Sequence, residues 1–305
     1  MFQNHNHNSR KNRGPGPAAR QVSAAVVLLA LILAAASVLA AEPEIKILPH
    51  PVDRGTAARV VVEGLTPADG LEGTFEGRPV FFFNIGKKLI GLFGADVTLS
   101  PGRYPLKLTW SGGEAQVEVP VRDRSYGVRS ITVPESQVQL SKSDRDRAAR
   151  ERRDVLAALA VKSPQRLWQG PWTDPVGGAV TSAFGRQTRI NGVLNPKPHG
   201  GTDLEAAEGA PVKAPADGVV ILTGDHFFAG RSVYIDHGQG VVSMYFHLSQ
   251  IKVETGGRIK RGDLLGLSGA TGRVDGAHLH YGIYICQARI DPVAFHRLTA
   301  LLPRQ

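Results

Sequence analysis

Residues 276–285 read GAHLHYGIYI, a β-prone run that carries two histidines two positions apart, His278 and His280. In a strand, residues two apart point to the same face and lie roughly 6.5–7 Å apart along it. The two imidazoles would then stand side by side, while Leu279 and Tyr281 would point the other way, toward a core. One histidine on a strand is usually structural. Two histidines on one face favour a site in which one binds a metal ion and the other points toward the same site.

A second motif, HGGTD at residues 199–203, supplies further candidate ligands. On a straight strand His199 and Asp203 would lie roughly 13 Å apart, too far to share one ion. Gly200 and Gly201 let the chain bend, so the two side chains could converge. Two histidines with one carboxylate form a three-ligand set for catalytic zinc, which leaves a fourth position open for water.

Hydrolysis at such a site needs one more group, to move protons or to stabilise the oxyanion. The sequence has no His-Glu-x-x-His pattern and therefore no glutamate base of that kind. His247 and His278 are the available candidates, because an unperturbed imidazole titrates near pH 6.5. The single cysteine, Cys286, excludes an internal disulfide and is poorly placed to close a structural zinc site.

The chain around these motifs is β-rich from Trp168 onward, with a glycine every few residues, which indicates an antiparallel sheet folded on itself. Four β-prone runs stand out, at residues 211–223, 232–237, 241–247 and 276–285. Three other histidines are given structural interpretations. His237 is interpreted as a turn residue, His226 as packing in a loop or groove, and His296 as a residue without a partner.

From Thr181 to Pro292, the motifs resemble in their order those of the LytM/lysostaphin-type zinc metallopeptidases, peptidase family M23. The matching pieces are SAFGR (182–186), HGGTDL (199–204), GAPVKAP (209–215), DGVV (217–220), IDHG (235–238), YFHLS (245–249), GATGR (269–273), HLH (278–280) and DP (291–292). The resemblance implies that His199, Asp203 and His280 bind one zinc ion per chain. It also implies that His247 and His278 are the catalytic pair beside the zinc-bound water, and that the substrates are peptide stems of peptidoglycan.

Upstream of the peptidase-like region, the sequence predicts a small β-sandwich as an accessory domain over residues 42–135. About seven short β-prone runs, one of them Ala95–Leu99, are separated by glycine turns, and Tyr104, Leu106 and Leu108 recur with the period of two that is typical of a strand. No catalytic constellation is found there, so this half is expected to bind or to position.

Residues 136–170 are predicted to be a helical connector. Ser143 and Asp146 form a capping box, residues 144–161 are rich in helix formers, and Pro164 ends the helix. The peptidase domain would then cover residues 171–305. The predicted fold class is mainly β, with an N-terminal signal or anchor, a β-sandwich, a helical connector and an antiparallel β-sheet metallopeptidase domain.

Residues 1–41 have the order of an export signal, since a basic, polar start precedes an apolar or small run from Val22 to Ala41. The run is about twenty residues long, enough to span a bilayer, so an uncleaved inner-membrane anchor is the rival interpretation. Either one places the rest of the chain in the periplasm or cell envelope. The net charge of +9 is not gathered with aromatic residues into a basic face, so no nucleic-acid partner is expected.

The predicted function is an exported zinc metalloendopeptidase in which zinc-activated water attacks the amide of a peptidoglycan cross-link and two histidines assist. The first alternative is a peptidoglycan-binding regulator or amidase activator without activity of its own. A lipoyl- or biotin-carrier-like module is the second, disfavoured because no carrier lysine is obvious. The resemblance favours a DD-endopeptidase that cuts D-alanyl–diaminopimelate cross-links, and glycine bridges are the alternative substrate. The N-terminal domain is expected either to cover the groove or to position the enzyme on the wall.

Overall fold

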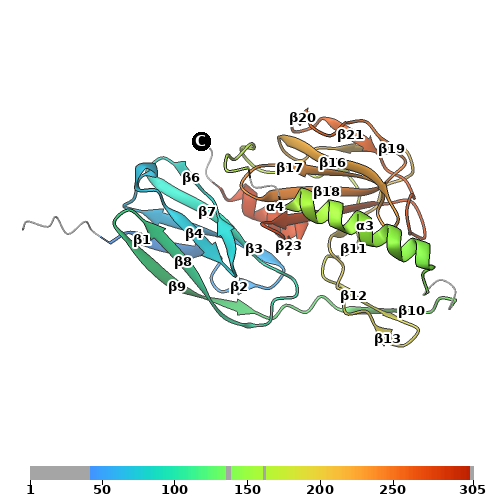
Figure 1. Cartoon of the computed structure of the whole chain (residues 1–305), viewed down its shortest axis with the longest axis horizontal. Helices are drawn as coiled ribbons and strands as arrows, with labels where there is room; N and C mark the ends of the chain where they lie inside the picture. The colour runs from blue at the N-terminus through green and yellow to red at the C-terminus, as the bar shows by residue number, and fades with distance from the viewer. Residues whose placement is uncertain (1–41, 135–138, 161–162, 303–305) are drawn as a thin grey trace, which may run out of the picture. The chain divides into compact units, whose positions relative to one another are not determined.

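The computed structural model describes residues 42–134, 139–160 and 163–302 (Figure 1). The predicted signal or anchor, residues 1–41, lies outside them. Within the described residues there are two α-helices, α3 (Lys142–Leu159) and α4 (Pro292–Ala300), and strands dominate the rest. The mainly β fold class is therefore confirmed. None of the helices in this described part is long and apolar enough to cross a membrane.

Residues 44–122 form two sheets around a shared core. One sheet has the order β1-β3-β7-β6 and the other β2-β9-β8-β4-β5. The strands are β1 (Glu44–Leu48), β2 (Val52–Asp53), β3 (Thr56–Glu63), β4 (Glu72–Phe75), β5 (Arg78–Val80), β6 (Phe82–Ile85), β7 (Lys88–Ala95), β8 (Gly102–Trp110) and β9 (Gly113–Arg122), with a 3₁₀ turn at Pro67–Asp69. Leu106 and Leu108 of β8 are buried in the core, as their alternation predicts.

One predicted strand in this region is wrong. Ala95 ends β7, and residues 96–99 turn away instead of continuing as a strand. The Asp96 carboxylate causes the turn, because it accepts hydrogen bonds from both the backbone N–H and the hydroxyl of Thr98.

The C-terminal region is built on an eight-stranded sheet with the path β11-β14-β22-β18-β17-β16-β20, to which β23 adds beside β22. Two three-stranded sheets accompany it, β15-β21-β19 and β10-β12-β13. The bounds are β10 (Val128–Ile131), β11 (Val180–Ser182), β12 (Gln187–Ile190), β13 (Val193–Leu194), β14 (Thr202–Leu204), β15 (Pro211–Lys213), β16 (Gly218–His226), β17 (Gly230–Asp236), β18 (Val241–Leu248), β19 (Gln250–Ile251), β20 (Arg258–Ile259), β21 (Leu264–Leu267), β22 (Leu279–Ile285) and β23 (Ala288–Ile290).

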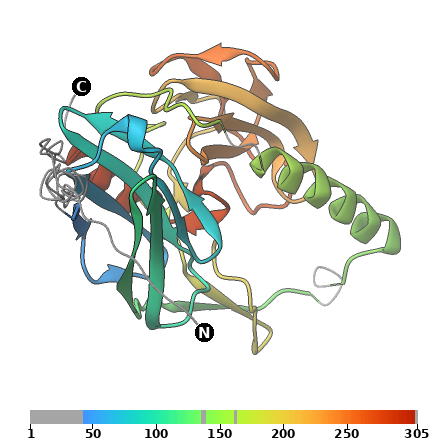
Figure 2. The same cartoon turned by 60° about the vertical axis from the view of Figure 1, so that its left-hand side comes forward.

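Helix α3 lies against this sheet beside β16 (Figure 2). Its Leu159 is buried in a cluster with Tyr234, Val242 and Met244. The predicted cap is wrong by two residues: Ser141, not Ser143, is the N-cap, and its hydroxyl accepts from the backbone N–H of Asp144.

The two β regions share part of their packing. Ala57, Val61 and Ile90 of the first region lie in the same hydrophobic cluster as the core of the second. Beside it, the Arg289 side chain donates to the Asp96 carboxylate through Nε and Nη2, at 3.1 and 2.8 Å. This ion pair joins β23 to the end of β7.

Candidate metal centre

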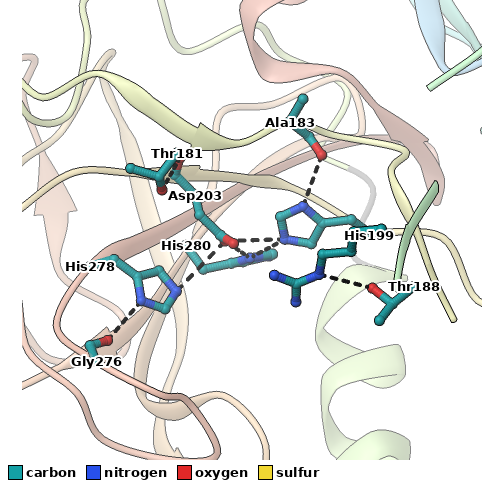
Figure 3. A network of polar contacts seen from close by, with 9 residues as sticks. Thr181, Ala183, Thr188, His199, Asp203, Gly276, His278 and His280 are labelled. Atoms are coloured by element: carbon teal, nitrogen blue, oxygen red, sulfur yellow. Dashed lines mark hydrogen bonds and ion pairs between the residues drawn. The ribbon is translucent and has the colours of Figure 1, made fainter. Parts of the chain in front are cut away.

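Three side chains converge where β14 and β22 lie side by side (Figure 3). Asp203 and His280 are directly opposite each other in this antiparallel pair, so their side chains point to the same face. The Asp203 Oδ1 atom lies 2.9 Å from Nδ1 of His280 and 3.1 Å from Nε2 of His199. Those two histidine nitrogens are 3.0 Å apart.

His199 reaches the strands from the preceding loop. Its backbone N–H donates to the Arg186 carbonyl, and its own carbonyl accepts from the backbone N–H of Gly185. These two hydrogen bonds fix the loop beside β11. The bend at Gly200-Gly201 then turns the side chain toward Asp203, so the predicted convergence is confirmed. Gly201 has a steric reason as well, because a Cβ there would lie 2.6 Å from Nε2 of His280.

These three residues could hold a metal ion, and their spacing can be compared with that of a zinc site. Around a tetrahedral zinc with bonds of about 2.0–2.1 Å, ligand atoms lie roughly 3.3 Å apart, close to the spacing observed here. The Nδ1 atom of His199 donates to the Ala183 carbonyl at 3.1 Å, which leaves the Nε2 lone pair free to bind a metal ion. The ring of Phe246 stacks on His280, with 5.1 Å between centroids, and holds its orientation.

The charge of Asp203 suits a cation. Burial alone would raise the pKa of this carboxyl. The neighbouring imidazoles of His199 and His280 outweigh burial and hold the pKa well below its usual range. Asp203 is therefore an anion at neutral pH, and two histidines with one carboxylate leave a fourth tetrahedral position for a further ligand.

His247 and His278 lie beside this cluster, with 4.9 Å between their ring centroids. The Nδ1 atom of His247 donates to the Thr271 carbonyl at 3.0 Å, and that of His278 donates to the Gly276 carbonyl at 2.9 Å. Because a carbonyl oxygen only accepts, Nδ1 carries the proton in both rings and Nε2 holds the lone pair.

His247 occupies a strained position. Its φ is +65°, rare for a residue with a side chain, and it falls where the register between β17 and β18 shifts. The bulge redirects the imidazole, and the His247 backbone N–H donates to the Ala229 carbonyl in the β16–β17 turn. Burial lowers the pKa of His247 to about 4, against a smaller opposite effect of the Thr271 carbonyl, so the imidazole is neutral at pH 7.

All five histidine and aspartate residues line one groove of about 760 Å³. Its walls include Phe228 from the β16–β17 turn, Arg129 from β10 and Arg273 from the loop before His278. The sequence did not predict either arginine as a groove residue. No local pattern marks Arg129, because it reaches the groove only through pairing of β10 with β12, some sixty residues later.

Three other histidines of the described residues do not line the groove. His237 is fully buried, bonded through Nδ1 to the Asp217 carbonyl and through Nε2 to the Ser243 hydroxyl. His226 bonds to the Ser232 hydroxyl. His296, expected to have no partner, contacts the Tyr281 hydroxyl and the Asp174 carboxylate, so that expectation is wrong.

Comparison with known proteins agrees with this geometry. Residues 197–292 match Peptidase family M23. A crystal structure from Pseudomonas aeruginosa, described as that of a peptidase M23, aligns with a TM-score of 0.66 and 33% identity. The alignment covers 83% of this chain and 97% of that one.

Two curated relatives come from Vibrio cholerae. The peptidoglycan DD-endopeptidase ShyA is 39% identical over 131 residues, which are 38% of this chain and 30% of ShyA. The peptidoglycan DD-endopeptidase ShyB is 35% identical over 154 residues, 45% of this chain and 34% of ShyB. The chain thus matches about a third of the length of these two relatives.

Proposed function

The chain belongs to peptidase family M23, and from that premise we propose that it is a zinc metalloendopeptidase that hydrolyses the peptide cross-links of peptidoglycan. One observation carries the proposal: two histidine nitrogens and one carboxylate oxygen lie 2.9–3.1 Å apart in a groove that also holds two further imidazoles. A catalytically inactive relative would be expected to lack part of that set.

His199, Asp203 and His280 would hold the zinc ion. Bound there, zinc would supply a Lewis acid and lower the pKa of a coordinated water to about 7. His247 and His278 would handle protons. Each has its Nδ1–H fixed by a backbone carbonyl, so each can accept a proton at Nε2 and later return it to the departing amine.

Peptidoglycan as the substrate is supported by the names of the relatives, both of which are DD-endopeptidases. We propose the same bond class here, the link between D-alanine and the diaminopimelate of a neighbouring stem. This substrate requires export, and we propose that residues 1–41 direct the chain to the periplasm or cell envelope, as a cleaved signal or as an inner-membrane anchor.

The N-terminal β region is proposed to position the enzyme rather than to cover the groove. Among the residues that the structure describes, none from 42 to 128 lines the groove. Since Ala57, Val61 and Ile90 are buried in the cluster shared with the peptidase region, removing this region would expose apolar surface.

The test is digestion of intact, cross-linked peptidoglycan by the zinc-loaded chain, with released muropeptides identified by mass spectrometry. Chelator-treated protein and the His247→Ala variant serve as controls. We expect dimeric muropeptides to disappear only with the active sample, and the product masses to identify the bond. Undigested dimers despite bound zinc would instead support a wall-binding regulator or amidase activator.

A further inference from the structure

Arg129 lies in the groove but comes from outside the predicted peptidase domain. In the parallel pair of β10 and β12, it stands opposite Thr188, and its Nε donates to the Thr188 hydroxyl at 3.2 Å. Figure 3 shows Thr188 on the His199 side of the cluster, with His278 on the other side of Asp203. The hydrogen bond therefore holds the guanidinium group at the His199 end of the site.

Arg129 forms no ion pair within the described part of the chain. Arg54, Arg147 and Arg289 each form an ion pair with a nearby acid. Arg129 has no such partner among the described residues, and its terminal Nη groups have no hydrogen-bond acceptor there. The terminal N–H donors of the guanidinium group are thus free to bind a ligand. A guanidinium group can bind a carboxylate through two parallel hydrogen bonds.

The other charged residues of the groove determine where a negatively charged peptide can bind. Glu205 and Asp275 also line the groove, beside Asp203. These protein carboxylates would repel a negatively charged peptide. A carboxylate of the peptide is therefore favoured only where the groove presents a positively charged side chain. Arg129 is one such position, on the His199 side of the cluster.

We infer that Arg129 binds a free carboxylate on the peptide next to the scissile amide, and so determines which cross-links are cut. The inference rests on the proposed function. A diaminopimelate residue whose amine is acylated in a cross-link keeps a free carboxylate on the same carbon, whereas the internal residues of a glycine bridge carry none. Arg129 therefore selects diaminopimelate-type cross-links over glycine bridges.

The experiment compares two purified cross-linked muropeptide dimers. One carries the free carboxylate beside the scissile amide, and in the other that group is a carboxamide. The kcat/KM for both is measured with the zinc-loaded full chain and with Arg129→Gln, Arg129→Lys and Arg189→Gln. Arg189 is the matched control, because it is an exposed arginine of the neighbouring strand β12 and does not line the groove.

The unmodified chain should prefer the carboxylate dimer by roughly 10- to 100-fold, the range for a charge-assisted hydrogen-bonded pair. Arg129→Gln should bring the ratio close to one, by losing activity on the carboxylate dimer alone. Arg129→Lys should keep part of the preference, and Arg189→Gln all of it. Equal use of both dimers by the unmodified chain, or equal losses on both in Arg129→Gln, would overturn the inference and leave the endopeptidase proposal intact.

Binding separates the inference from the proposed function. In the His247→Ala background, which is expected not to consume the dimers, calorimetry gives the Kd for each. Preference for the carboxylate dimer, lost on adding Arg129→Gln, supports the carboxylate site even if the unmodified chain cleaves neither dimer. Equal Kd values for both dimers would refute it.

Discussion

Replacing Gly201 with alanine tests how tightly the candidate metal centre is packed. A Cβ at this position would lie 2.5 Å from the Tyr281 carbonyl oxygen and 2.6 Å from Nε2 of His280. Ordinary van der Waals contact begins at 3.4 Å, so the His280 ring or the strand must move by roughly 0.8 Å. Zinc–ligand distances tolerate changes of about 0.2 Å. We expect Gly201→Ala to weaken zinc binding about 10- to 100-fold, or about 1.4–2.7 kcal/mol.

The matched control is the neighbouring glycine. A Cβ on Gly200 would find its nearest heavy atom, Cδ of Arg289, at 4.0 Å, and neither glycine has a positive φ. Gly200→Ala should therefore bind zinc as the unmodified chain does. Zinc affinity is measured by competition with a chromophoric chelator, and far-UV circular dichroism checks that both variants are folded. Equal affinities in the two folded variants would refute the reasoning.

Three other variants test separate parts of the account. His247→Ala should lower kcat about 10²- to 10⁴-fold while zinc affinity is unchanged, because His247 is proposed to move protons and not to bind the ion; lost zinc binding would contradict this. Glu151→Ala should lower kcat several-fold with zinc retained. The reason is that the Glu151 carboxylate accepts from the Phe227 N–H and so anchors the β16–β17 turn, which in turn holds His247. Asp154→Ala on the same helix is the control and should leave kcat unchanged. Asp96→Ala should reduce the free energy of unfolding by about 3 kcal/mol, as expected when one partner of a buried ion pair is removed. The pKa of Asp96 is about 2: burial raises it, but bonds to Arg289 and Thr98 lower it more, so the carboxylate stabilises the fold above about pH 4 and loses this effect as the pH falls through 2. Acid denaturation curves of the unmodified chain should therefore fall more steeply between pH 4 and 2 than those of Asp96→Asn, and parallel curves would argue against it.

Part of the candidate site was predictable because its chemistry is local in sequence. The HGGTD motif combines two ligand types with the glycines that let the chain bend, and its side chains do converge. The alternation around His278 and His280 also predicted a shared face, although β22 itself begins only at Leu279. The roles of these residues remain predictions.

The parts that were not predicted depend on long-range contacts or on a signal that was overlooked. Arg129 enters the groove through strand pairing with a segment far along the chain, and no spacing rule encodes such pairing. Helix α4 did have a local signal, because Asp291 followed by Pro292 is a common helix start. No helix is predicted there from the sequence, and α4 is therefore an element that only the structure reveals. The contact between Asp96 and Arg289 joins the two β regions, and neither sequence segment alone predicts it.

The central claim is most directly tested by titrating metal-free protein with zinc while following both bound zinc and cleavage of a cross-linked muropeptide dimer. The account predicts that cleavage rises in proportion to bound zinc and levels off at one ion per chain, and that His280→Ala shows neither binding at this site nor cleavage. Cleavage by the metal-free protein, or no cleavage with one zinc ion bound, would contradict it.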